Sequence, residues 1–259
     1  MSTSKDTDIN LISTHIWPKN AKRNNAGVLE IAGKNVIELE KDFETPLFIL
    51  DEDDALERAR RYRKSFSKDL FENKLSKETK IYYASKAFSA VRFLQMLAQE
   101  GLGIDVATEG ELRVALKAGI DPKDIIFHGN NKSLSELDFA LENNVGIFVV
   151  DSFFEIARLA QISSEKNKKA EVLIRVTAGV EAHTHEFVAT AHEDQKFGFS
   201  LAAGDADEAV RRVIKDENLN FKGLHSHIGS QIFENKAFEI AAQRLTELSV
   251  RIFKEHNVQ

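Results

Sequence analysis

Lys86 stands directly after a short apolar stretch, Ile-Tyr-Tyr-Ala-Ser at residues 81–85, that is typical of a β-strand. Because the side chains of a strand alternate between its two faces, Tyr82, Ala84 and Lys86 share one face. An amine that is desolvated at the end of a strand can act as a nucleophile at neutral pH and condense with an aldehyde. A lysine in such a place can also lay its stem on apolar surface and extend its ammonium group into solvent. The spacing alone leaves both roles open.

Two more charged residues lie inside otherwise apolar stretches. Asp105 occurs in Gly-Ile-Asp-Val-Ala-Thr at residues 103–108, where an unpaired carboxylate would be costly to bury. It either has a structural partner or lines a polar cavity. Arg175 occurs in Val-Leu-Ile-Arg-Val-Thr at residues 172–177, and a buried guanidinium group usually has an acidic or phosphate-like partner.

The segment Gly-Leu-His-Ser-His-Ile-Gly-Ser at residues 223–230 is the most distinctive in the chain. Alternation puts His225 and His227 on one face, with His227 nearer to the end of the strand. Gly229 lets the backbone come close to an anion, and Ser230 adds a hydroxyl donor. A single inward histidine is more often a core residue, but two of them followed by Gly-Ser favour a functional site.

A second group of histidines occurs in the long connection between residues 177 and 199. His183, His185 and His192, together with nearby carboxylates, could be interpreted as ligands of a metal ion in a barrel hydrolase. No strand fixes these three side chains, so we expect a loop rather than a metal site.

The elements that position these residues follow an alternating pattern. Short apolar runs are predicted as strands at residues 47–50, 80–84, 103–107, 124–127, 146–150, 171–176 and 221–228. Stretches with helical periodicity separate them at residues 54–67, 90–100, 109–118, 133–143, 153–166 and 205–215. Strict alternation implies an α/β fold with parallel strands and right-handed crossovers, in which chemistry belongs at the carboxyl ends of the strands. About seven strands predict an incomplete TIM-like (β/α)8 barrel, although a doubly wound open sheet would show the same pattern.

The first 45 residues do not follow this alternation. They begin with a polar, irregular stretch and contain two short strand candidates, at residues 28–31 and 36–39. We therefore divide the chain into an N-terminal segment, residues 1–45, and the incomplete barrel, residues 46–259.

Composition narrows the class of protein. The 259 residues carry a formal net charge of −6 with charges mixed along the chain, which argues against a nucleic-acid partner. No apolar run approaches the roughly 18 residues of a membrane span, and the N-terminus lacks the pattern of a signal peptide. We expect a cytoplasmic protein with no membrane partner. The absence of cysteine excludes disulfides, thiolate metal sites and a cysteine nucleophile in this chain.

Several segments, in order, resemble the diaminopimelate decarboxylases. They are residues 83–88 (Tyr-Ala-Ser-Lys-Ala-Phe), 103–112, 128–133 (His-Gly-Asn-Asn-Lys-Ser) and 225–231. The connection at residues 179–198 is similar to the actinobacterial branch of that family. The resemblance runs from about Trp17 to the last residue.

The resemblance implies a fold-type III enzyme that depends on pyridoxal 5'-phosphate. Such enzymes join an alanine-racemase-like barrel to a C-terminal β-domain and form head-to-tail homodimers. Lys86 would be the Schiff-base lysine, His227 would stack on the cofactor ring, and Ser230, next to Gly229, would bind the phosphate. Three further residues match positions that line the cofactor cavity in related basic amino-acid decarboxylases. They are Asp105, Glu111 and Arg175. Lys196 matches a position that tends to be structural, near the dimer interface.

The implied activity is a carboxy-lyase reaction that converts meso-2,6-diaminopimelate, a small amino-acid substrate, into L-lysine in lysine biosynthesis. The family's glycine-rich phosphate loop, the acid that pairs with the pyridine nitrogen, the substrate-binding residues and the C-terminal β-domain would all lie beyond residue 259. We therefore expect a fragment that is inactive alone.

Two alternative functions stay open on these residues. One is that of another fold-type III decarboxylase, acting on ornithine or arginine. The other is that of a non-catalytic pyridoxal phosphate carrier built as a single barrel. The chain length favours the carrier, whereas the His-Ser-His-Ile-Gly-Ser segment opposes it.

Overall fold

The computed structural model describes residues 11–13, 16–66, 79–180, 197–230, 232 and 235–258. The chain forms two compact units, Met1–Ile81 and Tyr82–Gln259. No helix among the described residues is long and apolar enough to cross a membrane.

The first unit contains a small antiparallel sheet and two helices. The sheet has the order β1 (Ala21–Arg23), β2 (Leu29–Ile31) and β3 (Lys34–Asn35). Helix α1 (Val36–Phe43) follows at once, and helix α2 (Glu52–Ser65) comes later.

Two strand predictions in this unit are wrong. Residues 36–39 form the start of α1, because the side chain of Asn35 accepts a hydrogen bond from the Ile37 amide and caps a helix there. Residues 47–50 form no strand, and the Phe48 side chain is almost fully exposed. Among the described residues, no strand pairs with this apolar run, and a periodicity pattern cannot reveal whether a pairing partner exists. How residues 1–45 relate to any further β-domain stays a prediction.

The second unit contains a parallel sheet. Its strands are β4 (Tyr82–Ala84), β5 (Gly103–Val106), β6 (Ile125–Phe127), β7 (Ile147–Val150), β8 (Ala170–Thr177) and β10 (Leu219–His225), which pair in the order β10-β8-β7-β6-β5-β4. A short strand that the sequence did not predict, β9 (Phe199–Ser200), pairs with β8. Each strand pairs with its neighbour along the chain, without the reversal of order that marks a doubly wound sheet. The sheet therefore has barrel topology, as predicted, and the doubly wound alternative is wrong.

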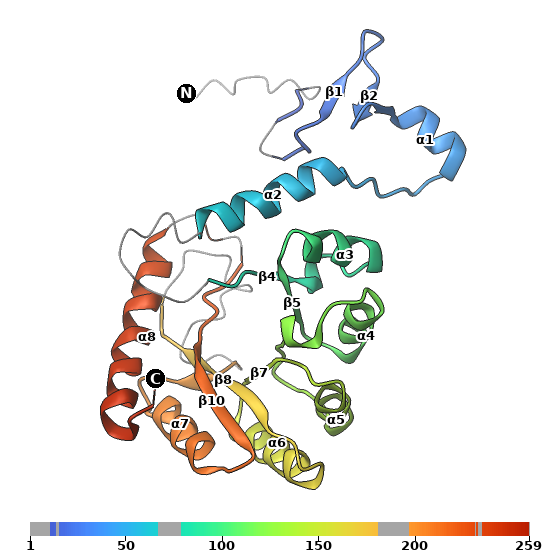
Figure 1. Cartoon of the computed structure of the whole chain (residues 1–259). Coiled ribbons are helices and arrows are strands. Elements are labelled where there is room, and N and C mark those ends of the chain that lie inside the picture. Colours follow the sequence, from blue (N-terminus) through green and yellow to red (C-terminus); the bar gives the residue numbers. More distant parts are fainter. Residues whose placement is uncertain are drawn as a thin grey trace. The chain divides into compact units, whose positions relative to one another are not determined.

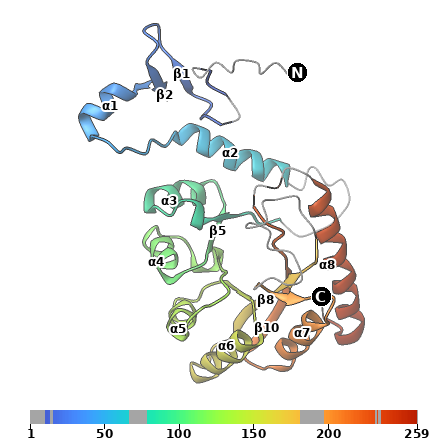
Figure 2. The same ribbon diagram turned by 180° about the vertical axis from the view of Figure 1, so that it is seen from behind.

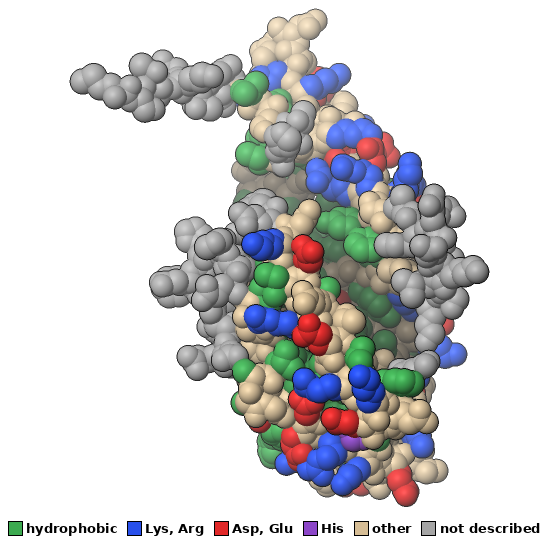
Figure 3. Space-filling view, turned by 90° about the vertical axis from the view of Figure 1, so that its left-hand side faces the viewer, with side chains coloured by type: hydrophobic (Ala, Val, Ile, Leu, Met, Phe, Trp, Pro, Cys, Tyr) green, Lys and Arg blue, Asp and Glu red, His purple; other side chains and the backbone are tan. Residues whose placement is uncertain are grey.

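Helices cover the outside of this sheet (Figures 1 and 2). They are α3 (Val91–Gln99), α4 (Glu109–Lys117), α5 (Leu134–Glu142), α6 (Phe153–Glu165), α7 (Asp205–Lys215) and α8 (Asn235–His256). Strand residues such as Ile104, Phe127 and Phe148 pack with helix residues such as Leu112 and Leu159 in one core, in which all five are fully buried. Positive and negative side chains are interspersed on the face shown in Figure 3, as the mixed charge pattern predicts.

Reciprocal capping boxes fix the first turns of α4 and α5. The Thr108 side chain accepts from the Glu111 amide while the Glu111 carboxylate accepts from the Thr108 amide, and Ser133 and Glu136 repeat the arrangement. The helices predicted at residues 109–118 and 133–143 therefore begin within one residue of their predicted starts. Each box ends the loop that follows a strand, so the chain returns from the strand end to its helix in a defined way.

Candidate active site

The predicted site residues lie at one edge of the parallel sheet, near the carboxyl ends of its strands. Lys86 lies in the 3-10 turn η2 (Ser85–Ala87), which follows β4 directly. Asp105 belongs to β5 and Arg175 to β8, while His227 lies two residues beyond the end of β10. The structure brings these four residues to the same edge because all four strands run parallel.

Asp105 is an acidic group whose charge interacts with that of Lys86. Burial raises the pKa of Asp105 to about 7, while the positive charges of Lys86 and Arg175 oppose that rise and the charge of Glu111 adds to it. Lys86 itself is exposed. A carboxyl group that titrates near neutral pH therefore lies within electrostatic reach of the candidate amine.

Arg175 has the acidic partner that its apolar surroundings predict. Its Nη1 lies 3.3 Å from Oδ1 of Asp151, and its guanidinium group lies 4.6 Å from the ring centroid of Phe197. Oδ2 of Asp151 accepts a hydrogen bond of 2.9 Å from the Gly198 amide. Burial lowers the pKa of Arg175, and the carboxylates of Asp151 and Asp105 oppose that shift. The partner is acidic, so Arg175 does not need a phosphate group to be compensated.

A buried ion pair, Lys132–Glu155, contacts the backbone of Asp151 and was not predicted as part of the site. Nζ of Lys132 donates to Oε1 of Glu155 over 2.6 Å, and both side chains are nearly inaccessible, at 1% and 6% exposed. The other carboxylate oxygen of Glu155 accepts from the Asp151 amide over 3.0 Å. A Ser-x-x-Glu pattern at Ser152 was the sequence signal for Glu155, but it indicates a helix start and not a contact with Lys132.

Three histidines line the same region. The rings of His128 and His225 meet edge to face with centroids 4.7 Å apart, and Nε2 of His128 lies 3.9 Å from Oδ1 of Asp105. Burial, together with the positive charge of Arg175, lowers the pKa of His128 to about 2, of His225 to about 3 and of His227 to about 4. All three imidazoles are thus neutral at physiological pH. Sequence reasoning placed His128 in a family motif but gave it no role.

Glu111 has a local function that the resemblance did not indicate. Its carboxylate accepts hydrogen bonds from the Ala107 and Thr108 amides, over 2.6 and 3.1 Å, and so belongs to the capping box of α4. It still acts on the site through charge, because it raises the pKa of Asp105.

Gly229 and Ser230 follow His227 on the same connection. Gly229 has a φ of +124°, a conformation that favours glycine, and Ser230 is exposed. A cavity of about 240 Å³ opens beside them, lined by Ser226, His227, Ile228, Gly229 and the α8 residues Phe238, Ala241, Ala242 and Leu245. The predicted phosphate-binding segment therefore borders a real cavity.

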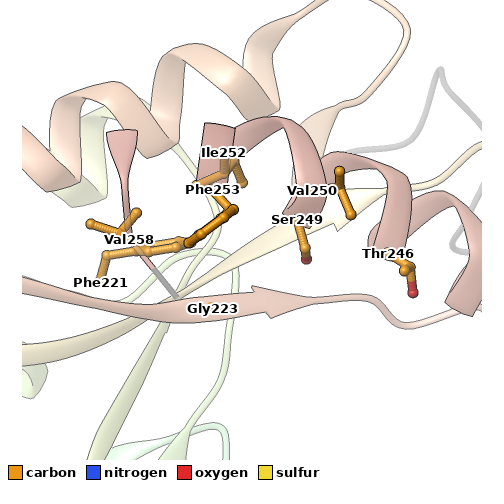
Figure 4. A pocket seen from close by; sticks show the side chains of 8 residues that line it. All are labelled: Phe221, Gly223, Thr246, Ser249, Val250, Ile252, Phe253 and Val258. Carbon is orange, nitrogen blue, oxygen red and sulfur yellow. The ribbon is translucent and has the colours of Figure 1, made fainter. Parts of the chain in front are cut away.

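A second, apolar pocket of about 310 Å³ lies between β10 and α8. Figure 4 shows Phe221, Phe253 and Val258 gathered at one end of it and Thr246 and Ser249 toward the other. None of the residues that line it is ionisable. It lacks the groups that acid–base or imine chemistry needs, so it is not the candidate site.

The histidine group at residues 183–192, and Lys196, lie outside the described residues. Within the described ranges, no group of three or more His, Asp or Glu side chains is arranged to hold a metal ion.

Comparison with known proteins decides the family. Residues 55–257 match the pyridoxal binding domain of the pyridoxal-dependent decarboxylases. The chain belongs to this family. Its cofactor is therefore pyridoxal phosphate, as predicted.

Diaminopimelate decarboxylases are among its most similar relatives. The one from Mycobacterium tuberculosis strain H37Rv is 47% identical over 237 residues, which cover 92% of this chain and 51% of the relative. The crystal structure of the M. jannaschii enzyme superposes with a TM-score of 0.85 at 30% identity, covering 93% of this chain and 55% of that one. A Helicobacter pylori diaminopimelate decarboxylase complexed with L-lysine gives a TM-score of 0.75 at 30% identity, covering 85% and 53%. The chain spans about half the length of the curated relatives it matches.

The residues at the strand ends fit this cofactor, which is an anionic aromatic aldehyde. Lys86 offers an amine, and Lys86 and Arg175 together offer positive charge toward an anion. Among the described residues, Nδ1 of His225 is buried and has no hydrogen-bond partner, so it is available to a polar group of a ligand. The neutral ring of His227 offers an aromatic face, and Gly229 allows a close approach of the backbone.

Proposed function

We propose that this site serves the decarboxylation of meso-2,6-diaminopimelate to L-lysine, with pyridoxal phosphate attached through Lys86. The observation that carries the proposal is the position of Lys86 at the end of β4, beside a carboxyl group on β5 that titrates near neutral pH. The names of the relatives, which share 41 to 47% of their aligned residues with this chain, support this substrate over ornithine or arginine.

The bound cofactor supplies an aldehyde that condenses with an amine, with loss of water, and a ring that accepts the electron pair left when carbon dioxide departs. The chain's own residues prepare for this. Asp105 is a proton acceptor with a pKa near 7 within electrostatic reach of the Lys86 ammonium group, which must lose a proton before its nitrogen becomes nucleophilic.

The remaining residues orient the cofactor and balance the charges around it. The ring of His227 is neutral and can stack on an aromatic ligand without adding a positive charge. Arg175, held by Asp151, keeps a fixed positive charge at the edge of the sheet and thereby helps to keep all three imidazoles neutral. Gly229 and Ser230 provide the place and the hydroxyl group for the phosphate.

The test of attachment is spectroscopic. The chain is mixed with pyridoxal phosphate, and we expect an absorbance band of a lysine adduct that persists on gel filtration and is trapped by borohydride. Lys86→Ala should abolish the band, whereas Lys117→Ala, a change of an exposed lysine on α4, should leave it intact. A trapped adduct on a lysine other than Lys86 would contradict the proposal.

The test of activity is release of carbon dioxide from carboxyl-labelled meso-diaminopimelate, L-ornithine and L-arginine. The proposal requires that any release be largest from diaminopimelate. Release from ornithine or arginine alone would favour the other decarboxylase class. Attachment through Lys86 with no release from any of the three would agree with the expectation that this chain is inactive alone, and would limit the proposal for this chain to the cofactor site.

Two further attributes stay predictions. A homodimer and a cytoplasmic location rest on the family resemblance and on composition.

A further inference from the structure

We propose that the buried Lys132–Glu155 ion pair positions Arg175 at the cofactor site, acting through Asp151. The inference rests on the proposed function, because Arg175 is taken to act on the cofactor attached at Lys86. None of the three residues Lys132, Asp151 and Glu155 belongs to the site that sequence reasoning predicted.

The first step concerns Lys132, whose ammonium group is held in place because each of its hydrogens has an acceptor. Its ammonium group has three hydrogens, and Nζ donates to Oε1 of Glu155 at 2.6 Å, to the Gly129 carbonyl at 2.7 Å and to the Val149 carbonyl at 2.9 Å. These acceptors belong to the loop after β6, to β7 and to α6. Lys132 therefore ties the loop after β6 to β7 and to the first turn of α6 at the carboxyl end of the sheet.

The second step passes from Glu155 to Asp151. Oε2 of Glu155 accepts from the Asp151 amide over 3.0 Å, directly after β7 ends. The helix start reinforces this geometry, because the Ser152 side chain accepts from the Glu155 amide at 3.2 Å. The backbone of Asp151 is thereby fixed by a charge-assisted hydrogen bond in a dry environment.

The third step passes from Asp151 to Arg175. The Asp151 carboxylate is 5% exposed and contacts both Nη1 of Arg175 and the Gly198 amide. Gly198 precedes β9, which pairs with β8, the strand that carries Arg175. Asp151 thus forms an ion pair with the guanidinium group through Oδ1 and a hydrogen bond with the backbone beside it through Oδ2.

The charges follow the order positive, negative, negative, positive from Lys132 to Arg175. Two buried carboxylates side by side are tolerated because a cation flanks each of them. A buried ion pair often stabilises a fold no more than apolar side chains of the same volume would. Stability alone therefore gives little reason for Lys132–Glu155, whereas fixing Asp151 under Arg175 does.

The experiment compares two double variants of the whole chain. Lys132→Met/Glu155→Gln removes both charges but keeps an acceptor for the Asp151 amide. Lys132→Met/Glu155→Leu removes both charges and that acceptor. The matched control, Lys222→Met/Glu171→Gln, removes the 2.6 Å pair on the outer part of β10 and β8, away from the site.

Three quantities are measured for each variant: the dissociation constant of pyridoxal phosphate, the pH midpoint of the adduct absorbance, and the thermal midpoint without cofactor. We expect the control to bind within threefold of the wild type with an unchanged pH midpoint. The Gln variant keeps an acceptor for the Asp151 amide but lacks the cation that holds it, so its affinity should lie between those of the control and the Leu variant. The Leu variant should bind at least tenfold more weakly. Its pH midpoint should rise by about half a unit or more, because a displaced Arg175 places less positive charge near the adduct.

Asp151→Asn supplies the decisive cross-check. If the pair acts through Asp151, the Leu variant should have no further effect on the pH midpoint in the Asp151→Asn background. A Leu variant with a lower thermal midpoint but wild-type cofactor readouts would overturn the inference, and so would additive effects with Asp151→Asn. A wild-type chain without a Lys86-dependent band would overturn the proposed function, and this inference with it.

Discussion

The imidazole rings of His128 and His225 meet edge to face at 75°, although β7 and β8 separate their strands in the sheet. His128 follows β6 and its amide donates to the Val106 carbonyl of β5, while His225 ends β10 beside Arg175. The contact therefore crosses the inside of a curved sheet. The two rings form a neutral layer against which Asp105 and Arg175 are buried.

This layer makes the fold sensitive to acid. The pKa of His128 is lowered in the folded chain, so below about pH 6.5 the unfolded chain binds a proton that the folded chain excludes. The stability contribution is present above that pH and is lost as the pH falls. His128→Phe keeps an aromatic ring but cannot take up this proton. Between pH 7.5 and pH 5, we expect its free energy of unfolding to fall by about 2 kcal/mol less than that of the wild type.

Urea unfolding at the two pH values measures this difference. His256→Gln, at the end of α8 and outside the layer, is the control and should follow the wild type. If the free energy of unfolding fell equally in His128→Phe and in the wild type between pH 7.5 and pH 5, His128 would take up protons as readily in the folded chain as in the unfolded one.

Asp105 has the opposite pH dependence. Burial raises its pKa to about 7, so between about pH 4 and pH 7 the folded chain holds a proton that the unfolded chain has released. Its stability contribution is therefore present at low pH and is lost as the pH rises through 7. Asp105→Asn cannot ionise. Its free energy of unfolding, relative to that of the wild type, should therefore be about 2 kcal/mol higher at pH 8 than at pH 5.

The same unfolding series checks this expectation. Asp138→Asn, which removes a partly exposed partner of Lys166 on α5, serves as the control and should show a much smaller pH-dependent difference. If the stability difference between Asp105→Asn and the wild type were the same at both pH values, Asp105 would already be ionised at pH 5 and would be too weak a base to hold a proton from Lys86 near neutrality.

The sequence predicted the parts of the site that depend on strand ends. Apolar runs indicate β4, β5, β8 and β10 because buried parallel strands are apolar on both faces. Once the strands are parallel, Lys86, Asp105 and Arg175 must share an edge. The charged residues within these runs could thus be grouped from the sequence alone.

The parts that depend on long-range packing could not be predicted. Lys132 has the appearance of an ordinary polar loop residue, and only its approach to Glu155, 23 residues later, makes it a buried group. His128 acquires a role through a contact with His225 across the sheet. Strand β9 has two residues and pairs only because β8 extends beside it. Periodicity indicates which face of an element is apolar but not which distant residue covers it.

Glu111 has two candidate roles that can be tested directly: the first is to cap helix α4, and the second is to influence the cofactor site through the charge of Asp105. Glu111→Ala and Glu136→Ala break the capping boxes of α4 and α5. Each change also removes a second backbone contact, from the Ala107 amide to Glu111 and from the Glu109 amide to Glu136, so each should lower the free energy of unfolding by at least about 1 kcal/mol. If Glu111 also acts on the site through Asp105, only Glu111→Ala should weaken pyridoxal phosphate binding. Denaturant unfolding and a cofactor titration separate the two roles. Equal cofactor affinities in both variants would leave Glu111 as a helix cap alone.

Gly198 connects the backbone of β9 to the position of Arg175. Its φ is +75°, and a Cβ atom there would lie 2.9 Å from the Arg175 carbonyl oxygen, 3.0 Å from Oγ1 of Thr177 and 3.1 Å from Cγ of Arg175. Gly204, at φ +83°, would meet nothing within 4 Å. Alanine at either position has the backbone strain of a left-handed residue, about 1 kcal/mol, but only at position 198 does it also collide with β8.

We therefore expect Gly198→Ala to be at least about 1 kcal/mol less stable than Gly204→Ala, because the collision involves a backbone oxygen that cannot move freely. Gly198→Ala should also weaken pyridoxal phosphate binding, since it displaces Arg175 and the amide that holds Asp151. Gly204→Ala should bind the cofactor as the wild type does. Equal stability and equal cofactor affinity in the two variants would mean that β8 yields to the added methyl group, so that the exact position of Arg175 has little importance for the site.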